Sequence, residues 1–187
     1  MCFFRSAIKR GMGWPQAFAA LGRAAPLIEG ELDTVGAGSA GLLVRPTSEQ
    51  SAEALAAELV RACSQRAPGG GRVQVSTDAQ GFGWLTVEGQ GVAGVAEALV
   101  GLGPVLEATG LLPRVLAVAV PLTWNGRRLY WLYQPRIKAF TPFVPDPAAG
   151  EQERDHALEV RMAAATRKAI PVHGDTQEWY PVWDVPL

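Results

Sequence analysis

The 187-residue sequence contains only two cysteines and two histidines. Cys2 and Cys63 are too few for a disulfide framework. Neither His156 nor His173 has a second ligand at the spacing of a metal site. The sequence therefore predicts no structural metal and no bound cofactor. It also predicts that Cys63, on the apolar face of a helix, is a buried free thiol.

The sequence also lacks an excess of charge of one sign and a long apolar run. The net charge of −1 gives no bulk attraction to nucleic acid. No apolar run reaches the ~18 residues that span a bilayer. The basic N-terminus has neither the long apolar core nor the cleavage site of a signal peptide. These absences predict a cytoplasmic protein with at most peripheral membrane contact.

What is present is an ordinary globular composition, with 48% hydrophobic and 19% charged residues. The first periodic segment is a short amphipathic helix over 14–22, with Trp14, Phe18 and Leu21 on one stripe. A loop over 24–37 should follow it. We therefore predict that residues 1–37 form an N-terminal extension and that residues 38–187 form one domain.

Three further helices are predicted from i, i+3, i+4 spacing of apolar residues. The helix over 48–64 has Thr47 and Gln50 in the positions of a capping box. The next begins near residue 92 and should kink or break at Pro104, because proline has no backbone N–H to donate. The last helix spans about 151–168 and carries many charged residues.

Five strands are predicted between these helices, over 41–45, 72–77, 82–88, 114–122 and 129–135. The strand from residue 114 is apolar on both faces, which places it centrally in a sheet. Asn125-Gly126 after it is a strong signal for a tight hairpin. The order α-β-α-β-β-α-β-β-α is rich in hairpins, and it predicts an α+β fold with a largely antiparallel sheet and helices packed on one face.

The last nine residues hold two tryptophans, a tyrosine and two prolines. Rings of this size remove roughly 150–250 Å² each from water when they are buried, so we expect this tail to pack against the domain and hold the last helix onto the sheet. An arginine of that helix could lie over a tail tryptophan. The predicted structural anchors are Trp84, Phe143, Arg154, Glu159, Trp179 and Trp183.

Two functional hypotheses compete with a purely structural role for the residues that follow. Ser39 lies in Ala-Gly-Ser-Ala-Gly and His173 follows downstream, so a small hydrolase can be drawn, although the strand–turn–helix context of a nucleophile elbow is absent. The overlapping G-x-G-x-x-G at 36–41 also lacks the helix that dinucleotide binding requires. Alternatively, Tyr130 and Trp131 with nearby arginines could bind a ligand or RNA by stacking.

Several stretches in order resemble the PspAB family of PspA-associated proteins, which is tied to the phage-shock membrane-stress system. They include Tyr-Trp-Leu-Tyr at 130–133, Thr-Pro-Phe-Val-Pro at 141–145 and Trp-Tyr-Pro-Val-Trp-Asp at 179–184. The remaining matching stretches are 81–88, 153–159 and 170–172. The opening at 12–23 also resembles the family, which suggests translation from Met12 rather than Met1.

The resemblance implies an accessory role and no known catalytic residue. It implies a coiled-coil PspA-like partner and an association with a membrane metalloprotease of the HtpX type. We therefore expect a non-enzymatic adaptor that acts through protein–protein interaction. The side chains predicted to contact the partner are Trp14, Phe18, Leu21 and Trp131.

Overall fold

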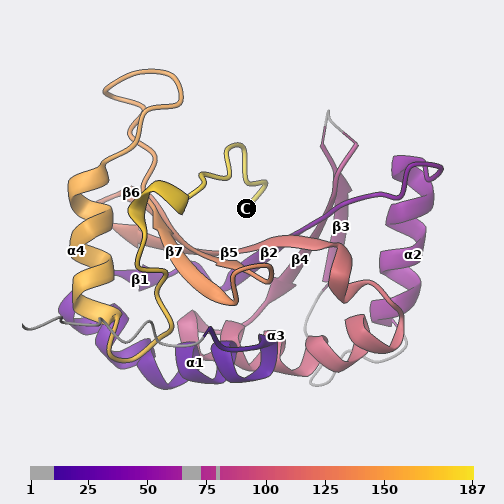
Figure 1. Cartoon of the computed structure of the whole chain (residues 1–187), viewed down its shortest axis with the longest axis horizontal. Helices are drawn as coiled ribbons and strands as arrows, with labels where there is room; N and C mark the ends of the chain where they lie inside the picture. The colour runs from indigo at the N-terminus through magenta and orange to yellow at the C-terminus, as the bar shows by residue number, and fades with distance from the viewer. Residues whose placement is uncertain (1–10, 65–72, 79–80) are drawn as a thin grey trace, which may run out of the picture.

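The computed structural model describes residues 11–64, 73–78 and 81–187. Within these ranges the chain forms four α-helices and one seven-stranded antiparallel sheet (Figure 1). The helices are α1 (Trp14–Glu31), α2 (Ala52–Ser64), α3 (Gly91–Ala108) and α4 (His156–Thr166). The strands are β1 (Val35–Gly36), β2 (Ser39–Val44), β3 (Val73–Thr77), β4 (Gly83–Glu88), β5 (Val115–Trp124), β6 (Arg127–Gln134) and β7 (Ala139–Phe143).

The strands lie in the order β3-β4-β2-β5-β6-β7, and the short β1 pairs with β5. The α+β class and the antiparallel sheet agree with the prediction, and β5 occupies the central position that its apolar faces indicated. Asn125 and Gly126 join β5 to β6 with φ angles of 47° and 76°. Positive φ at both central residues is what a type I′ hairpin turn requires.

The predicted count of about five strands is too low by two. β7 contains Pro142, which breaks the strand pattern in the sequence because proline cannot donate to a ladder. It is tolerated here because β7 pairs only with β6 along its length, apart from one parallel bridge between Phe140 and Val172. β1 is only two residues long, too short to give a periodic signal.

Helices α1 and α3 lie side by side across one face of the sheet, while α2 and α4 stand at its two ends (Figure 1). The buried side chains of all four helices join those of the sheet in a single apolar core. Trp14 at the start of α1 donates its indole N–H to the carbonyl of Leu99 at 2.6 Å. Gly103 permits this approach, since a Cβ there would lie 2.6 Å from the indole ring.

The short helix and loop predicted over 14–37 are wrong. α1 continues to Glu31 through Pro26, because Ala24, Ala25 and Ile28 are buried and continue the packing against the core. Residues 14–36 thus belong to the same core as the rest of the sheet and do not form an extension. Residues 1–10, and with them Cys2 and the question of the start at Met1 or Met12, lie outside the described residues.

The capping-box prediction for the second helix needs correction, and the prediction at Pro104 of the third is narrowed. α2 begins at Ala52, where the Ser51 hydroxyl accepts a hydrogen bond from the N–H of Ala54 at 3.2 Å. The contact from Thr47 N–H to Gln50 is 3.5 Å long and lies before the helix. α3 runs through Pro104 to Ala108, so of the predicted kink or break the break is excluded.

By length and composition α3 is the one helix in the described part of the chain that could cross a membrane. Its eight buried residues face α1 and the sheet, where they belong to the common core.

None of the four α-helices in the described ranges packs across the opposite face of the sheet. It is covered by the chain after η3 (Thr176–Glu178), drawn in yellow in Figure 1, which crosses above the strands. Here Ala119, Tyr130, Leu132 and Phe143 form a second, small apolar cluster, against which Val182, Trp183 and Val185 pack.

Candidate functional site

The start of the C-terminal segment is fixed by a buried ionic network at α4. The carboxylate of Glu159 is fully buried and accepts hydrogen bonds from the Val144 N–H at 3.0 Å and from Arg154 at 2.7 and 3.0 Å. Arg154 also donates to the main-chain carbonyl of Trp179 at 2.7 Å. Because one guanidinium joins α4 to the C-terminal segment, Arg154 and Glu159 hold the two together.

Trp179 is buried between this network and the loop before it. Its indole N–H donates to the carbonyl of His173 at 3.0 Å, and its ring lies 5.9 Å from that of His156. The expected stacking of an arginine over a tail tryptophan is replaced by the hydrogen bond from Arg154 to the Trp179 carbonyl. The guanidinium takes this geometry because Glu159 holds its other nitrogens.

Beyond Trp179 the segment lies on the outer face of the sheet without regular structure. Trp183 meets Phe143 edge-to-face at 4.8 Å, and Phe143 stacks on Tyr130 at 5.8 Å. Leu187 reaches as far as Gly41 of β2, where a Cβ would lie 3.2 Å both from its side chain and from the ring of Trp84. Side chains rather than a backbone ladder therefore hold this part of the chain in place.

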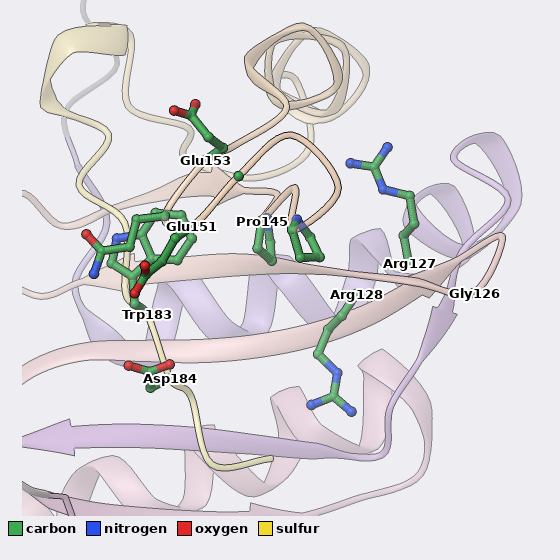
Figure 2. Close-up of a pocket in the computed structure, with 11 residues that line it drawn as sticks. Gly126, Arg127, Arg128, Pro145, Glu151, Glu153, Trp183 and Asp184 are labelled. Atoms are coloured by element: carbon green, nitrogen blue, oxygen red, sulfur yellow. The ribbon is translucent and has the colours of Figure 1, made fainter.

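A surface cavity of about 710 Å³ opens where three separate parts of the chain meet (Figure 2). The β5–β6 hairpin forms one wall, the loop that precedes α4 forms the second, and the C-terminal segment forms the third. Its lining residues are Gly126, Arg127, Arg128, Pro145, Pro147, Gly150, Glu151, Gln152, Glu153, Trp183 and Asp184. The loop is closed at its neck by a hydrogen bond from the Asp146 N–H to the Glu153 carbonyl at 2.8 Å.

Both arginines of the cavity are already engaged. Arg127 lies 3.1 Å from Asp155 and 3.7 Å from Asp146. The N–H of Leu158 lowers the pKa of the Asp155 carboxyl, and Arg127 adds to this effect. Arg128, on the opposite side of the strand, donates to the main-chain carbonyl of Leu187 and lies beside the hydroxyl of Tyr130.

Unlike the two arginines, the three acidic side chains of the cavity are not engaged by other described residues. Glu151, Glu153 and Asp184 are exposed, and none of them makes an ion pair with another residue that the structure describes. Asp155 and Asp146 compensate the charge of Arg127, whereas the main-chain oxygen that holds Arg128 does not cancel its charge. Three carboxylates against this one guanidinium still leave the cavity with a net negative charge. Trp183 adds an aromatic surface to the same wall as Asp184.

The side chains predicted to contact a partner lie elsewhere, and this prediction needs correction. Trp14 is 5% exposed, and Phe18, Leu21 and Trp131 are fully buried. They form the core between α1 and the sheet because the stripe that looked like a free amphipathic face packs against Tyr133 and Phe140. Tyr130 is 6% exposed beneath Phe143, so the predicted stacking platform for RNA does not exist as a surface.

Ser39 and His173 do not form a catalytic pair. Ser39 begins β2, whereas the N–H of His173 bonds to the carbonyl of Phe140 in β7. β5 and β6 lie between these strands, which puts roughly 14 Å between them at the usual strand spacing. His173 instead lies 2.9 Å from Glu178. Among the described residues no group of three or more His, Cys, Asp or Glu could hold a metal ion.

The amino-acid sequence does not predict the cavity itself. The only local sign is the proline-rich loop at 142–147, followed by two unpaired glutamates, which predicts a turn but not what faces it. Gln152 and Asp184 both have positive φ, 56° and 55°, and no sequence pattern marks either position. The predicted anchors Trp84, Phe143 and Trp183 lie on the same sheet face, and Trp183 is also a wall of the cavity.

The fold and the cavity together define an α+β protein in which an aromatic C-terminal segment covers a bare sheet face and builds a charged surface cavity. The chain matches the family of PspA associated protein B over residues 13–187 and therefore belongs to the PspAB family. No curated protein and no solved structure matches the chain.

Proposed function

We propose that this protein is a non-enzymatic accessory component of a PspA-type membrane-stress response and that it acts by binding its PspA homologue. The observation that carries the proposal is the match to PspA-associated proteins across nearly the whole chain. A family defined by association with one protein is most simply explained by a binding surface for that protein. The proposed site of action is the cytoplasm, with at most peripheral membrane contact.

The cavity supports binding over chemistry. Its lining residues are charged or aromatic, glycine or proline, apart from Gln152, and the two arginines are held by partners on the protein itself. Such groups recognise the charge and shape of another surface. Because the stripe of Trp14, Phe18 and Leu21 is buried, the partner surface is assigned to the side of the molecule formed by the hairpin, the loop and the C-terminal segment.

A binding experiment with purified components tests the proposal. The PspA homologue encoded in the same genome would be immobilised, and binding of this protein would be measured by interferometry. An unrelated coiled-coil protein of similar net charge serves as the matched control. We expect saturable binding to the PspA homologue alone. Absence of binding by protein that is folded by circular dichroism would contradict the proposal.

The association with an HtpX-type membrane protease stays a second prediction about partners. It would be tested by affinity purification from membrane-stressed cells, with enrichment of the protease as the expected result.

A further inference from the structure

The cavity between the β5–β6 hairpin, the loop before α4 and the C-terminal segment holds an imbalance of free charge. Arg127 and Arg128 line it, but Asp155 and the Leu187 carbonyl already engage them. Glu151, Glu153 and Asp184 have no ionic partner in the described chain. From this we infer that the cavity accepts basic side chains, arginine or lysine, from a segment of a protein partner.

The aromatic wall gives a second and independent reason for a cationic ligand. Trp183 lines the cavity next to Asp184 (Figure 2). Its ring is held by an edge-to-face contact with Phe143. Tryptophan is the side chain that attracts a guanidinium or ammonium most strongly through its ring. A carboxylate and a tryptophan on the same wall together suit an arginine, whose planar group both stacks and donates in pairs.

The size of the cavity favours a peptide over a single ion. About 710 Å³ is within the range of cavities that hold drug-sized ligands, so there is room for more than one side chain. The Nη2 of Arg127 is buried and lies 3.7 Å from Asp146, so this arginine stays engaged within the protein and leaves the room in the cavity to the ligand.

The inference deepens the proposed function, because it names the chemistry by which the partner is recognised, and it rests on that function for the partner being a protein. The test uses the full chain and a fluorescein-labelled peptide of repeating leucine and arginine. A twin peptide with glutamate in place of arginine is the ligand control. Fluorescence anisotropy at low and high salt measures each dissociation constant.

The decisive variant is the triple change E151Q/E153Q/D184N, which removes the free charges with little change in shape. The matched control is E31Q/E49Q/E107Q, which removes the same charge from three exposed positions on other elements. We expect the cavity variant to bind the arginine peptide at least tenfold more weakly and the control to bind as the unmodified protein does. W183L should weaken binding several-fold, and high salt should weaken it further.

Several results would overturn the inference. One is binding of the arginine peptide by the cavity variant with the same dissociation constant as by the unmodified protein, and another is a loss of binding in the control variant as large as in the cavity variant. Binding of the glutamate peptide would also overturn it, as would displacement of the arginine peptide by spermidine with the same affinity as the peptide. Normal binding of the PspA homologue by the cavity variant would overturn the inference and leave the proposed function standing. Binding of the arginine peptide as expected, without any binding of the PspA homologue, would contradict the proposed function and leave the charge preference of the cavity standing.

Discussion

The two faces of the sheet are built from alternate residues of the same strands and are covered in different ways. On one face Leu129, Trp131 and Tyr133 of β6 lie beneath α1 and α3 and are at most 1% exposed. On the other face Tyr130 and Leu132 lie beneath an irregular segment whose Trp183 is only partly buried. The helix-covered face is sealed, whereas the face beneath the C-terminal segment stays partly open and forms one wall of a cavity.

This difference separates stability from recognition within one sheet. A large, dry core tolerates few changes of shape, because protein interiors are packed as densely as organic crystals. The second cluster is small and adjoins solvent through Trp183 and the cavity. We therefore expect substitutions on the helix-covered face to unfold the protein and substitutions on the other face to change binding first.

The largest effect is expected for Phe18→Ala on the helix-covered face. Phe18 is fully buried and contacts the rings of Trp14, Tyr133 and Phe140. Its removal should lower the free energy of unfolding by about 3–5 kcal/mol, measured by urea denaturation. Trp183→Ala is the comparator and should cost clearly less, because its ring is only partly buried and its contact with Phe143 adds about 1 kcal/mol beyond the area it covers. Equal losses of unfolding free energy in the two variants would contradict the difference between the two faces of the sheet.

The next effect is expected for Arg154→Ala, which removes the link between α4 and the C-terminal segment. Glu159 would keep its buried carboxylate but lose the guanidinium that neutralises it. Breaking a buried pair from one side costs roughly 3 kcal/mol, seen as a lower midpoint of urea unfolding. The double variant R154A/E159A is the control and should lose less than the sum of the two single changes. Simple additivity would show that the pair does not act as a unit.

A smaller effect is expected at Asp155, which caps α4 and pairs with Arg127 behind the cavity. Asp155→Ala should cost about 1 kcal/mol in thermal unfolding, whereas Asp155→Asn keeps a capping oxygen and should cost less. The pKa of Asp155 is lowered from 3.8 by the Leu158 N–H and Arg127. The ionised form therefore contributes its full stabilisation at pH values well above the ordinary pKa of 3.8, and this contribution is lost as the pH falls through the lowered pKa.

The pH test for Asp155 compares acid unfolding of the two proteins. The unmodified protein and Asp155→Ala should differ in stability at pH 7 and converge at pH values well below 3.8. A constant difference across this range would contradict the assigned role of the carboxylate.

The last prediction concerns the reactivity of the Cys63 thiol rather than the stability of the protein. Cys63 lies in the sealed core at the end of α2. Burial raises the pKa of its thiol to about 11. In a Cys2→Ser variant, labelling of Cys63 by a thiol reagent at pH 8 should be slow until denaturant is added, because both access and the thiolate are lacking. Labelling at the rate of the unfolded chain would show that the helix-covered face is not sealed.

Much of the sheet could be predicted from local patterns. Asn125-Gly126 fixed the hairpin, and the doubly apolar run in β5 fixed the central strand, because both depend on neighbouring residues alone. Pro26 and Pro142 caused the two largest errors. Each removes one backbone donor, and in each case tertiary packing or an edge position makes that loss tolerable, which the local sequence does not reveal.

The cavity could not be predicted in the same way. Its walls come from residues near 127, near 151 and near 183, which are adjacent only after the sheet and α4 have formed. The same holds for burial of the Trp14 stripe, since an amphipathic helix facing a sheet and one facing a partner have the same spacing. The sequence showed that the C-terminal rings must pack, but which face they cover depends on the register of β6.

The claim that one sheet face binds a ligand while the other is sealed is tested most directly by fluorine NMR. The protein would be labelled with 5-fluorotryptophan and titrated with the arginine–leucine peptide. Trp183 and Trp131 would be assigned with the variants W183F and W131F. We expect the chemical shift of Trp183 to change during the titration until binding is saturated. The resonance of Trp131, on the sealed face, should stay in place. A stationary Trp183 resonance alongside a moving Trp131 resonance would contradict this claim.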